Sequence, residues 1–210
     1  MHREKTALIA MSGGVDSSVA AYLTVKSGYK CMGTTMRLYR NEDLGLCNFH
    51  TCCSQKDIDD ASEVAFNLDI PYEVLDFTFD FKNKIIDKFI STYEAGGTPN
   101  PCIDCNRFMK FDKLMRFAKE KQLNFVVTGH YARIDYINGR YLLKKARDLS
   151  KDQSYVLYSL TQEQLAHTLF PLGDYEKSET RKIAEENGFV NSKKPDSQDI
   201  CFVPDGDYVK

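Results

Sequence analysis

The sequence has no long hydrophobic run, and none of its apolar stretches approaches the roughly 18 residues that a membrane-spanning helix requires. The first apolar stretch, Thr6–Met11, leads directly into a glycine-rich turn, without the small-residue cleavage site of a secretory signal. This stretch is therefore interpreted as a strand rather than a signal peptide. The two absences predict a cytoplasmic protein that has no membrane partner.

The chain also lacks an excess of either charge, since 28 Lys and Arg residues and 30 Asp and Glu residues give a formal net charge of −2. Such a balance gives no general attraction to nucleic acid, so a polyanionic partner would have to bind a local basic patch. One set of basic residues would either form such a patch or remain on solvated faces. The set consists of Arg107, Lys110, Lys113, Arg116, Lys119, Lys144, Lys145, Arg147 and Lys151.

Two common phosphate-binding motifs, GxxxxGK[ST] and GxGxxG, are not matched at the turn after the first expected strand. The turn instead reads SGGVDSS and leads into a helical segment that Gly28 ends. Its two glycines allow a tight turn and a close approach to a ligand, and the amides at a helix start point at anions. Ser12 and Ser17 add hydroxyl groups, and Asp16 would suit a magnesium ion. The alternative is a plain turn with a serine cap.

Strand-like and helix-like segments alternate along the chain, which predicts an α/β fold with a doubly wound, mostly parallel sheet. The expected strands are 6–11, 29–38, 70–77 and 124–132, and the expected helices are 19–28, 57–68, 81–96 and 106–121. A hairpin around Asn138-Gly139 and helical segments at 161–169 and 176–188 follow. We therefore expect a core domain at 1–135, an extension of it at 136–200 and the start of a truncated central domain at 201–210.

Seven cysteines are an odd number, and without a secretory signal they favour reactive, redox or metal-binding thiols over a disulfide framework. The stretch TPNPCIDCN, expected to be a loop, places Cys102 and Cys105 in a CxxC pattern. This pattern alone fits a metal site, a disulfide or a nucleophile with a neighbour. A second group has zinc-ligand residue types without the usual paired spacing, namely Cys47, His50, Cys52 and Cys53. Cys31 is expected in the core.

The turn SGGVDSS resembles the pyrophosphate loop (PP-loop) of the ATP-pyrophosphatase superfamily, whose members cleave ATP between the α and β phosphates. Five stretches then occur in the order seen in bacterial tRNA-uridine 2-sulfurtransferases, the 2-thiouridylases. They are AMSGGVDSSVAAYL, TPNPCIDCNRFMKFDKL, VTGHYARI, KDQSYVLYSL and SQDICFV. The resemblance covers almost the whole chain. Members of that family continue into a central domain and a C-terminal barrel, so we expect the 210 residues to be too few for turnover.

The resemblance implies ATP-dependent 2-thiolation of the wobble uridine (U34) of tRNA, with Mg²⁺, tRNA and a sulfur-donor relay protein or desulfurase as partners. Cys105 matches the nucleophile of the family, and Cys201 matches the cysteine that carries the persulfide. The residues expected to contact ATP are Ala10, Met11, Ser12, Gly13, Gly14, Val15, Asp16, Ser17, Met36 and Gly129. Those expected to contact tRNA are Asn100, Pro101 and Cys102 at the target base, His130 at the tRNA-facing rim, and Lys151, Asp152 and Gln153.

The chain departs from the usual family pattern NPDxxCN, because Cys102 replaces the acidic residue and Asp104 stands beside Cys105. The replacement leaves a second mechanism open, in which Cys102, Cys105 and Cys201 hold a [4Fe–4S] cluster. Cys102 would otherwise be a small replacement without a role. Two other functions also remain open: an adenylating amidotransferase or ligase of the same superfamily, and a truncated module that binds nucleotide or tRNA without catalysis.

Overall fold

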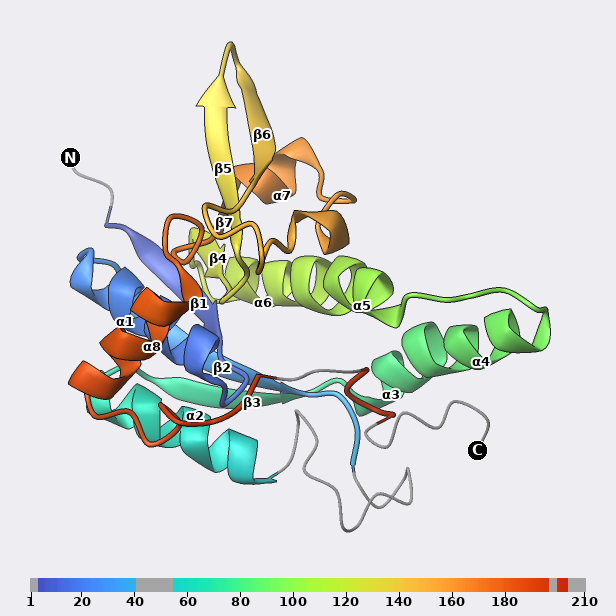
Figure 1. Ribbon diagram of the computed structural model, residues 1–210, viewed down its shortest axis with the longest axis horizontal. Coiled ribbons are helices and arrows are strands. Elements are labelled where there is room, and N and C mark those ends of the chain that lie inside the picture. The colour runs from blue at the N-terminus through green and yellow to red at the C-terminus, as the bar shows by residue number, and fades with distance from the viewer. Residues whose placement is uncertain (1–3, 41–54, 197–199, 204–210) are drawn as a thin grey trace.

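The computed structural model describes residues 4–40, 55–196 and 200–203. Within them, five parallel strands form the main sheet in the order β3-β2-β1-β4-β7 (Figure 1). The strands are β1 (Thr6–Ala10), β2 (Lys30–Arg37), β3 (Tyr72–Asp76), β4 (Phe125–Val127) and β7 (Thr168–Leu169). The predicted doubly wound α/β sheet is confirmed.

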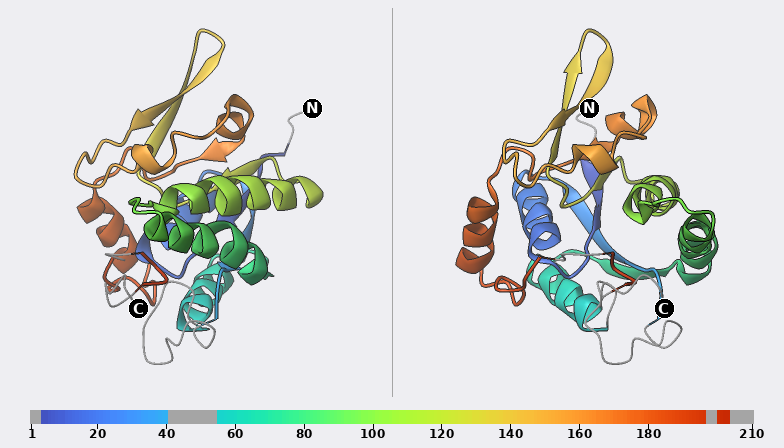
Figure 2. Two further views of the ribbon diagram at one scale, coloured as in Figure 1. Left: turned by 90° about the vertical axis from the view of Figure 1, so that its right-hand side faces the viewer. Right: turned by 45° about the vertical axis from the view of Figure 1, so that its right-hand side comes forward.

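Helices cover both faces of this sheet (Figure 2). One face carries α1 (Val15–Lys26), α2 (Gln55–Asn67) and α8 (Lys177–Glu186), and the other carries two long helical segments. The first segment comprises α3 (Thr78–Phe81), η2 (Lys82–Ile86) and α4 (Asp87–Glu94). The second comprises α5 (Pro101–Asp104), η3 (Cys105–Lys113) and α6 (Leu114–Glu120). The segments η2 and η3 are π-helical, a form that is rare and frequent at functional sites.

The central strand β1 is buried on both faces, as its continuous apolar sequence TALIA requires. Successive side chains alternate between the two faces of a strand. Ala7 and Ile9 accordingly pack in the cluster on the α1 side, while Leu8 packs with Leu114 and Val126 on the α6 side.

The chain reverses its direction of travel across the sheet between β1 and β4. From β1 the chain continues through α1 to β2 and through α2 to β3. It then crosses the other face of the sheet and places β4 on the opposite side of β1. Open α/β sheets bind ligands at such a switch point, outside the carboxyl ends of the strands. The residues after β1 and β4, which include Gly13 and Gly129, are therefore the first place to look for a site.

A two-stranded antiparallel hairpin, β5 (Ala132–Ile137) and β6 (Arg140–Lys145), projects from the body of the molecule (Figure 1). Asn138 and Gly139 both have positive φ, at 50° and 79°, as a tight hairpin turn requires. The chain continues through η4 (Ser154–Val156) and α7 (Gln162–Ala166). No helix in the described ranges is both long and apolar enough to span a bilayer.

Two expectations about secondary structure were wrong. Pro101–Asp104 is helical rather than a loop, because the Asn100 side chain accepts a hydrogen bond from the Cys102 amide and Pro101 occupies the first turn, where proline is tolerated. Thr168–Leu169 leaves the helical segment expected at 161–169 and pairs with β4. The division into domains stays a prediction, and β7 ties the 136–200 extension to the main sheet.

Candidate functional site

The predicted phosphate loop connects β1 to α1 and is organised around one hydroxyl group. The Ser17 Oγ accepts from the Ser12 amide at 3.1 Å and donates to the Gly14 carbonyl at 3.0 Å. Helix α1 has Gly14 at its N-cap, and no side chain within the described chain caps its first turn. The first amides of a helix lack partners in the helix and attract anions. The loop is thus suited to hold phosphate groups.

Gly13 packs tightly against the start of α2. Its φ is +69°, and a β-carbon at this position would lie 2.3 Å from the Asp57 carbonyl oxygen. The Gly13 carbonyl accepts hydrogen bonds from the side chains of Asn191 and Lys194, each at 3.0 Å. Both residues lie far along the chain and belong to no motif, so sequence analysis missed them. Asn191 and Lys194 follow α8 in the chain, and their hydrogen bonds attach the PP-loop to this C-terminal segment.

Lys194 joins the loop to two acidic residues of α2, Asp57 and Asp60. Burial alone would lower the pKa of Lys194, but the hydrogen bonds and charges of these two carboxylates outweigh it and raise the pKa above 10.5. Lys194 therefore carries its charge at neutral pH and holds the loop, α2 and the C-terminal segment together.

Asp16 already has a cationic partner. The Lys177 Nζ contacts both carboxylate oxygens at 2.7 and 2.8 Å, and the Tyr131 hydroxyl donates to one of them at 3.0 Å. Burial, followed by the Asp16 charge, raises the pKa of Tyr131, which keeps its proton for this hydrogen bond. A magnesium ion on Asp16 would have to displace an ammonium group, so Asp16 in this arrangement does not fit the metal role expected from the sequence.

Lys177 also contacts Asp196 at 2.8 Å, and Asp196 accepts from Lys151 and Arg181. Burial would raise the pKa of Asp196, but hydrogen bonds and charges from Lys177 and Lys151 lower it below 3.8. One carboxylate thus gathers three cations beside the PP-loop. Sequence analysis assigned no role to Lys177, Arg181 or Asp196.

Gly129 follows β4 and lies directly against the start of α1. A β-carbon on it would lie 2.8 Å from the Asp16 carbonyl carbon and 2.8 Å from the Ser17 nitrogen. Met36, near the carboxyl end of β2, is partly buried between two hydrophobic clusters. Met36 thus lies on β2 and Gly129 directly after β4, the two strands that flank β1. Contact of the two residues with ATP stays a prediction.

His130 is expected at the rim that faces tRNA, and its contact with tRNA stays a prediction. Its side chain is buried, with 6% of the residue exposed, and it contacts the Phe111 and Phe170 rings. One ring nitrogen lies 2.7 Å from the Thr128 hydroxyl and the other 3.4 Å from the Lys110 Nζ. Burial, and then the Lys110 charge, hold the pKa of His130 well below 6.5. His130 is therefore neutral at pH 7 and accepts a hydrogen bond from the Lys110 ammonium group.

We expect the low pKa of His130 to make the fold sensitive to acid. A group whose pKa is depressed on folding contributes stability above its unfolded pKa of about 6.5, and this stability is lost as the pH falls towards the folded value. Urea unfolding at pH 7.5 and pH 5.0 should show a loss at the lower pH that His130→Gln reduces. An equal loss in both proteins would contradict the buried, neutral state.

The three residues of KDQ, expected to contact tRNA, make contacts within the chain. Lys151 pairs with Asp196, the Asp152 carboxylate accepts from the Ala146 amide and the Ser154 hydroxyl, and Gln153 accepts from the Tyr131 amide. These contacts order the segment between β6 and η4. Contact of the three side chains with tRNA stays a prediction.

Cys105 and Cys201 are brought to one place although they lie far apart in the sequence. Both are partly buried against the cluster of Leu38, Tyr39, Phe81, Ile85 and Met109, here called the Phe81 cluster. The Tyr39 hydroxyl donates a hydrogen bond to the Cys201 carbonyl. The Phe202 ring packs edge-on against the Phe81 ring, with 5.7 Å between the ring centroids. Segment 200–203 lies beside α3 in Figure 1. Leu38 and Tyr39 follow β2, so the cluster lies at the carboxyl edge of the sheet, as the PP-loop does.

Cys102 differs from this pair because it is exposed and does not belong to the Phe81 cluster. Its carbonyl accepts from the Asn106 side chain at 2.9 Å. No three Cys, His, Asp or Glu residues in the described ranges are grouped closely enough to hold a metal ion. Cys102, Cys105 and Cys201 are therefore not arranged as cluster ligands in this conformation. The suggested zinc ligands Cys47, His50, Cys52 and Cys53 lie outside the described residues.

The accessibility of the thiols leads to a prediction about their chemical modification. Burial raises the pKa of Cys31 to about 11, while Cys102 is exposed. Because the thiolate is the reactive form, iodoacetamide at pH 8 should label Cys102 well before Cys31, by about 100-fold or more in rate. Peptide mass spectrometry over a time course measures both sites. Comparable rates at the two cysteines would show that Cys31 is not buried in the core. Labelling of the unfolded protein in urea gives the reference rate for each cysteine.

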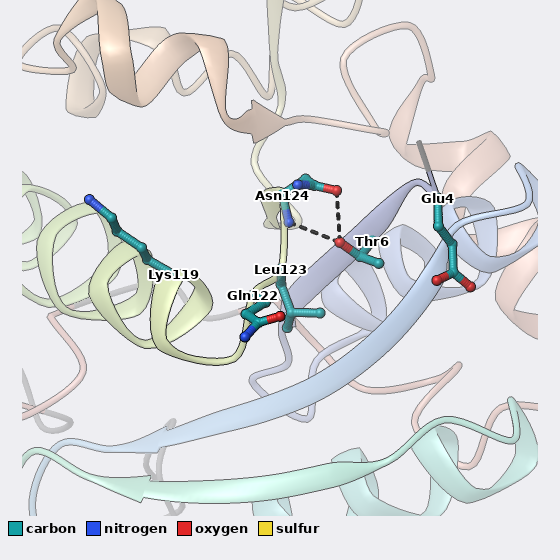
Figure 3. Close-up of a pocket in the computed structure, with 6 residues that line it drawn as sticks. All are labelled: Glu4, Thr6, Lys119, Gln122, Leu123 and Asn124. Carbon is teal, nitrogen blue, oxygen red and sulfur yellow. Dashed lines mark hydrogen bonds between the residues drawn. The ribbon is translucent and has the colours of Figure 1, made fainter. Parts of the chain in front are cut away.

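A polar pocket lies at the opposite edge of the sheet, near the beginnings of β1 and β4 (Figure 3). Thr6 and Asn124 exchange two hydrogen bonds across its floor, at 2.9 and 3.0 Å. Its lining contains Lys119 from the set of basic residues, but none of the residues expected to contact ATP or to carry sulfur. The carboxyl edge of the sheet, and not this pocket, is the candidate site.

Comparison with known proteins identifies the family of the chain. The family described as "tRNA methyl transferase HUP domain" matches residues 5–205. The chain belongs to this family. The tRNA-specific 2-thiouridylase MnmA of Clostridioides difficile is 52% identical over 211 residues, which cover 100% of this chain and 58% of that protein. The MnmA of Symbiobacterium thermophilum is 51% identical over 210 residues, which cover 97% of this chain and 54% of that protein. The resemblance inferred from the motifs is confirmed.

The chain thus spans a little more than half the length of these curated relatives. Solved structures agree on the fold. A 4-thiouridine synthetase–RNA complex with bound ATP matches with a TM-score of 0.65 and 18% identity, over 95% of this chain and 45% of that one. A predicted subunit of tRNA methyltransferase from Methanocaldococcus jannaschii matches with a TM-score of 0.50 and 19% identity, over 87% of this chain and 75% of that one.

Proposed function

We propose that this chain provides the catalytic domain for ATP-dependent 2-thiolation of the wobble uridine of tRNA. The observation that carries the proposal is the position of Cys105 and Cys201, which share the Phe81 cluster at the same sheet edge as the PP-loop. A ligase that transfers ammonia needs the loop but has no use for two cysteines there. The identity to tRNA-specific 2-thiouridylases supports the same substrate class.

The first step activates a poor electrophile. The C2 oxygen of uridine attacks the α-phosphorus of ATP, the bond to the β-phosphate breaks, and pyrophosphate leaves with the electron pair. The amides at the start of α1 would stabilise the negative charge on the phosphates. The oxygen at C2 thereby becomes part of a good leaving group, AMP.

The second step delivers sulfur. A thiolate on Cys105 attacks the inner sulfur of a persulfide on Cys201, which forms a Cys105–Cys201 disulfide and releases hydrosulfide. The hydrosulfide adds to C2, its proton goes to solvent, and the C2–O bond breaks as AMP leaves with the electron pair. A thiol reductant then supplies the two electrons that reopen the disulfide. The packing of both cysteines against the Phe81 cluster supports this exchange.

The remaining assignments belong to the same proposal. Asn100, Pro101 and Cys102 would lie at the target base, and a sulfur-donor protein or desulfurase would load Cys201. Magnesium would arrive with the phosphates of ATP, because Lys177 covers Asp16. A [4Fe–4S] cluster on Cys102, Cys105 and Cys201 would require the three thiols to come closer together. The reaction would take place in the cytoplasm, where tRNA is matured.

The test compares two nucleophiles, sulfur and ammonia, in a reaction with the gene product that carries this chain. Purified protein, ATP and unmodified tRNA are incubated with a persulfide donor and a thiol reductant or with ammonia, and the nucleosides are analysed by mass spectrometry. We expect 2-thiouridine at the wobble position only with the persulfide donor, together with one pyrophosphate for each sulfur. Ammonia-dependent turnover would support the ligase instead. ATP binding without pyrophosphate release would support a binding module.

A further inference from the structure

Lys110 is a half-buried cation that has no anionic partner among the described residues. It lies on η3, and its Nζ contacts the neutral imidazole of His130 at 3.4 Å. Within the described ranges it forms no ion pair, whereas the nearby Lys88 and Lys113 pair with Asp104 and Asp80. Charges removed from water are normally compensated by an opposite charge. The position of Lys110 therefore favours an anion that comes from a ligand.

The segment after β4 connects Lys110 to the PP-loop. Gly129 lies against Asp16 and Ser17 so closely that a β-carbon would collide with their backbone. The next residue, His130, contacts Lys110, and Thr128 contacts the other ring nitrogen of His130. Three consecutive residues thus join the start of α1 to the side chain of Lys110.

Lys110 is also connected to the sulfur chemistry through η3. Cys105 begins this π-helical segment, and residues five apart in a π-helix are joined by its hydrogen bonds and lie about one turn apart. Lys110 is five residues after Cys105. Lys110 thus adjoins the PP-loop side through His130 and the Cys105 side through η3. Under the proposed function, the α-phosphate of an adenylated uridine would lie between these two sides.

Resting on the proposed function, we propose that Lys110 contacts the α-phosphate during adenylation and that His130 is the positioning residue that holds it there. A neutral imidazole serves this role because it accepts a hydrogen bond from the ammonium group without neutralising its charge. The imidazole is fixed in turn by Thr128 and by the Phe111 and Phe170 rings. As the bond to pyrophosphate breaks, Lys110 would stabilise the charge on the non-bridging oxygens.

The experiment uses Lys110→Gln and Lys110→Arg in the gene product that carries this chain. Single-turnover pyrophosphate release is measured at saturating ATP and tRNA, and ATP binding is measured separately. Loss of one preorganised charge contact typically costs about 100-fold in rate. We expect this loss in Lys110→Gln, recovery to within about tenfold of wild type in Lys110→Arg, and ATP affinity within about threefold of wild type in both.

Lys26→Gln is the matched control, because Lys26 lies in the last turn of α1, at the end remote from the PP-loop. It should release pyrophosphate at the wild-type rate. A Lys110→Gln variant that matches Lys26→Gln would overturn the proposal, as would a rise in the KM for tRNA with an unchanged maximal rate, which indicates contact with a tRNA phosphate. Failure of the wild type to form 2-thiouridine would instead reject the proposed function itself.

Discussion

Replacing Cys201 by serine should abolish formation of 2-thiouridine while leaving ATP binding unchanged. A serine hydroxyl cannot carry a persulfide, so the sulfur has no carrier, whereas the PP-loop does not depend on this side chain. We expect the rate of thiolation to fall by at least about 1,000-fold, as when a covalent catalyst is removed. The measurement is sulfur incorporation from a labelled donor into tRNA, with ATP affinity measured on the same preparation.

Cys105→Ser should be equally inactive for a different reason, because the persulfide on Cys201 would form and remain. Mass spectrometry of this variant should find the additional sulfur on Cys201. Cys102→Ser separates the two mechanisms. Under persulfide chemistry it keeps activity within about tenfold of wild type, since Cys102 lies outside the Phe81 cluster. If anaerobic reconstitution yields stoichiometric iron that all three variants lose, the cysteines are cluster ligands and the persulfide account is wrong.

Gly13→Ala should have the largest effect on the nucleotide loop. The positive φ alone costs an alanine about 1–2 kcal/mol. In addition, the new β-carbon would lie 2.3 Å from the Asp57 carbonyl oxygen, so the loop must separate from α2. That movement would break the contacts of Asn191 and Lys194 with Gly13. We expect a loss of about 3 kcal/mol or more in unfolding free energy, as for other severe backbone conflicts, and no measurable ATP binding.

Gly28→Ala is the matched control for backbone strain. Gly28 also has a positive φ, at 81°, but a β-carbon there would have no neighbour within 4 Å. This variant should lose only about 1–2 kcal/mol and bind ATP normally. Chemical denaturation and calorimetric titration with ATP measure the two quantities. If both variants lose the same stability and bind ATP equally well, the close packing of the PP-loop against α2 has no functional role.

The parts of the site that the sequence predicted are those that are local in the chain. SGGVDSS contains its own turn residues, helix start and hydroxyl groups, and the structure places them together. The alternation of strand-like and helix-like segments likewise predicted the parallel sheet. The helix at Pro101–Asp104 was missed although its signals, the Asn100 cap and the proline that follows, are local as well. Here the CxxC pattern between prolines was interpreted as a loop.

The residues that sequence analysis missed reach the site only through folding. Lys177 lies 161 residues from Asp16, and Lys194 lies 181 residues from Gly13. Nothing near Lys177 distinguishes it from other charged residues at a helix start. The burial of His130 is not evident from the sequence for the same reason, since it depends on aromatic residues from η3 and from beyond β7.

The most direct test of the whole account follows one oxygen atom. Unmodified tRNA is prepared with ¹⁸O at C2 of the wobble uridine and is incubated with ATP, a sulfide donor and the gene product that carries this chain. Adenylation at O2 followed by sulfur attack predicts that the ¹⁸O appears in AMP in equal amount to the 2-thiouridine formed. AMP without ¹⁸O, with the label still in the RNA, would contradict the account.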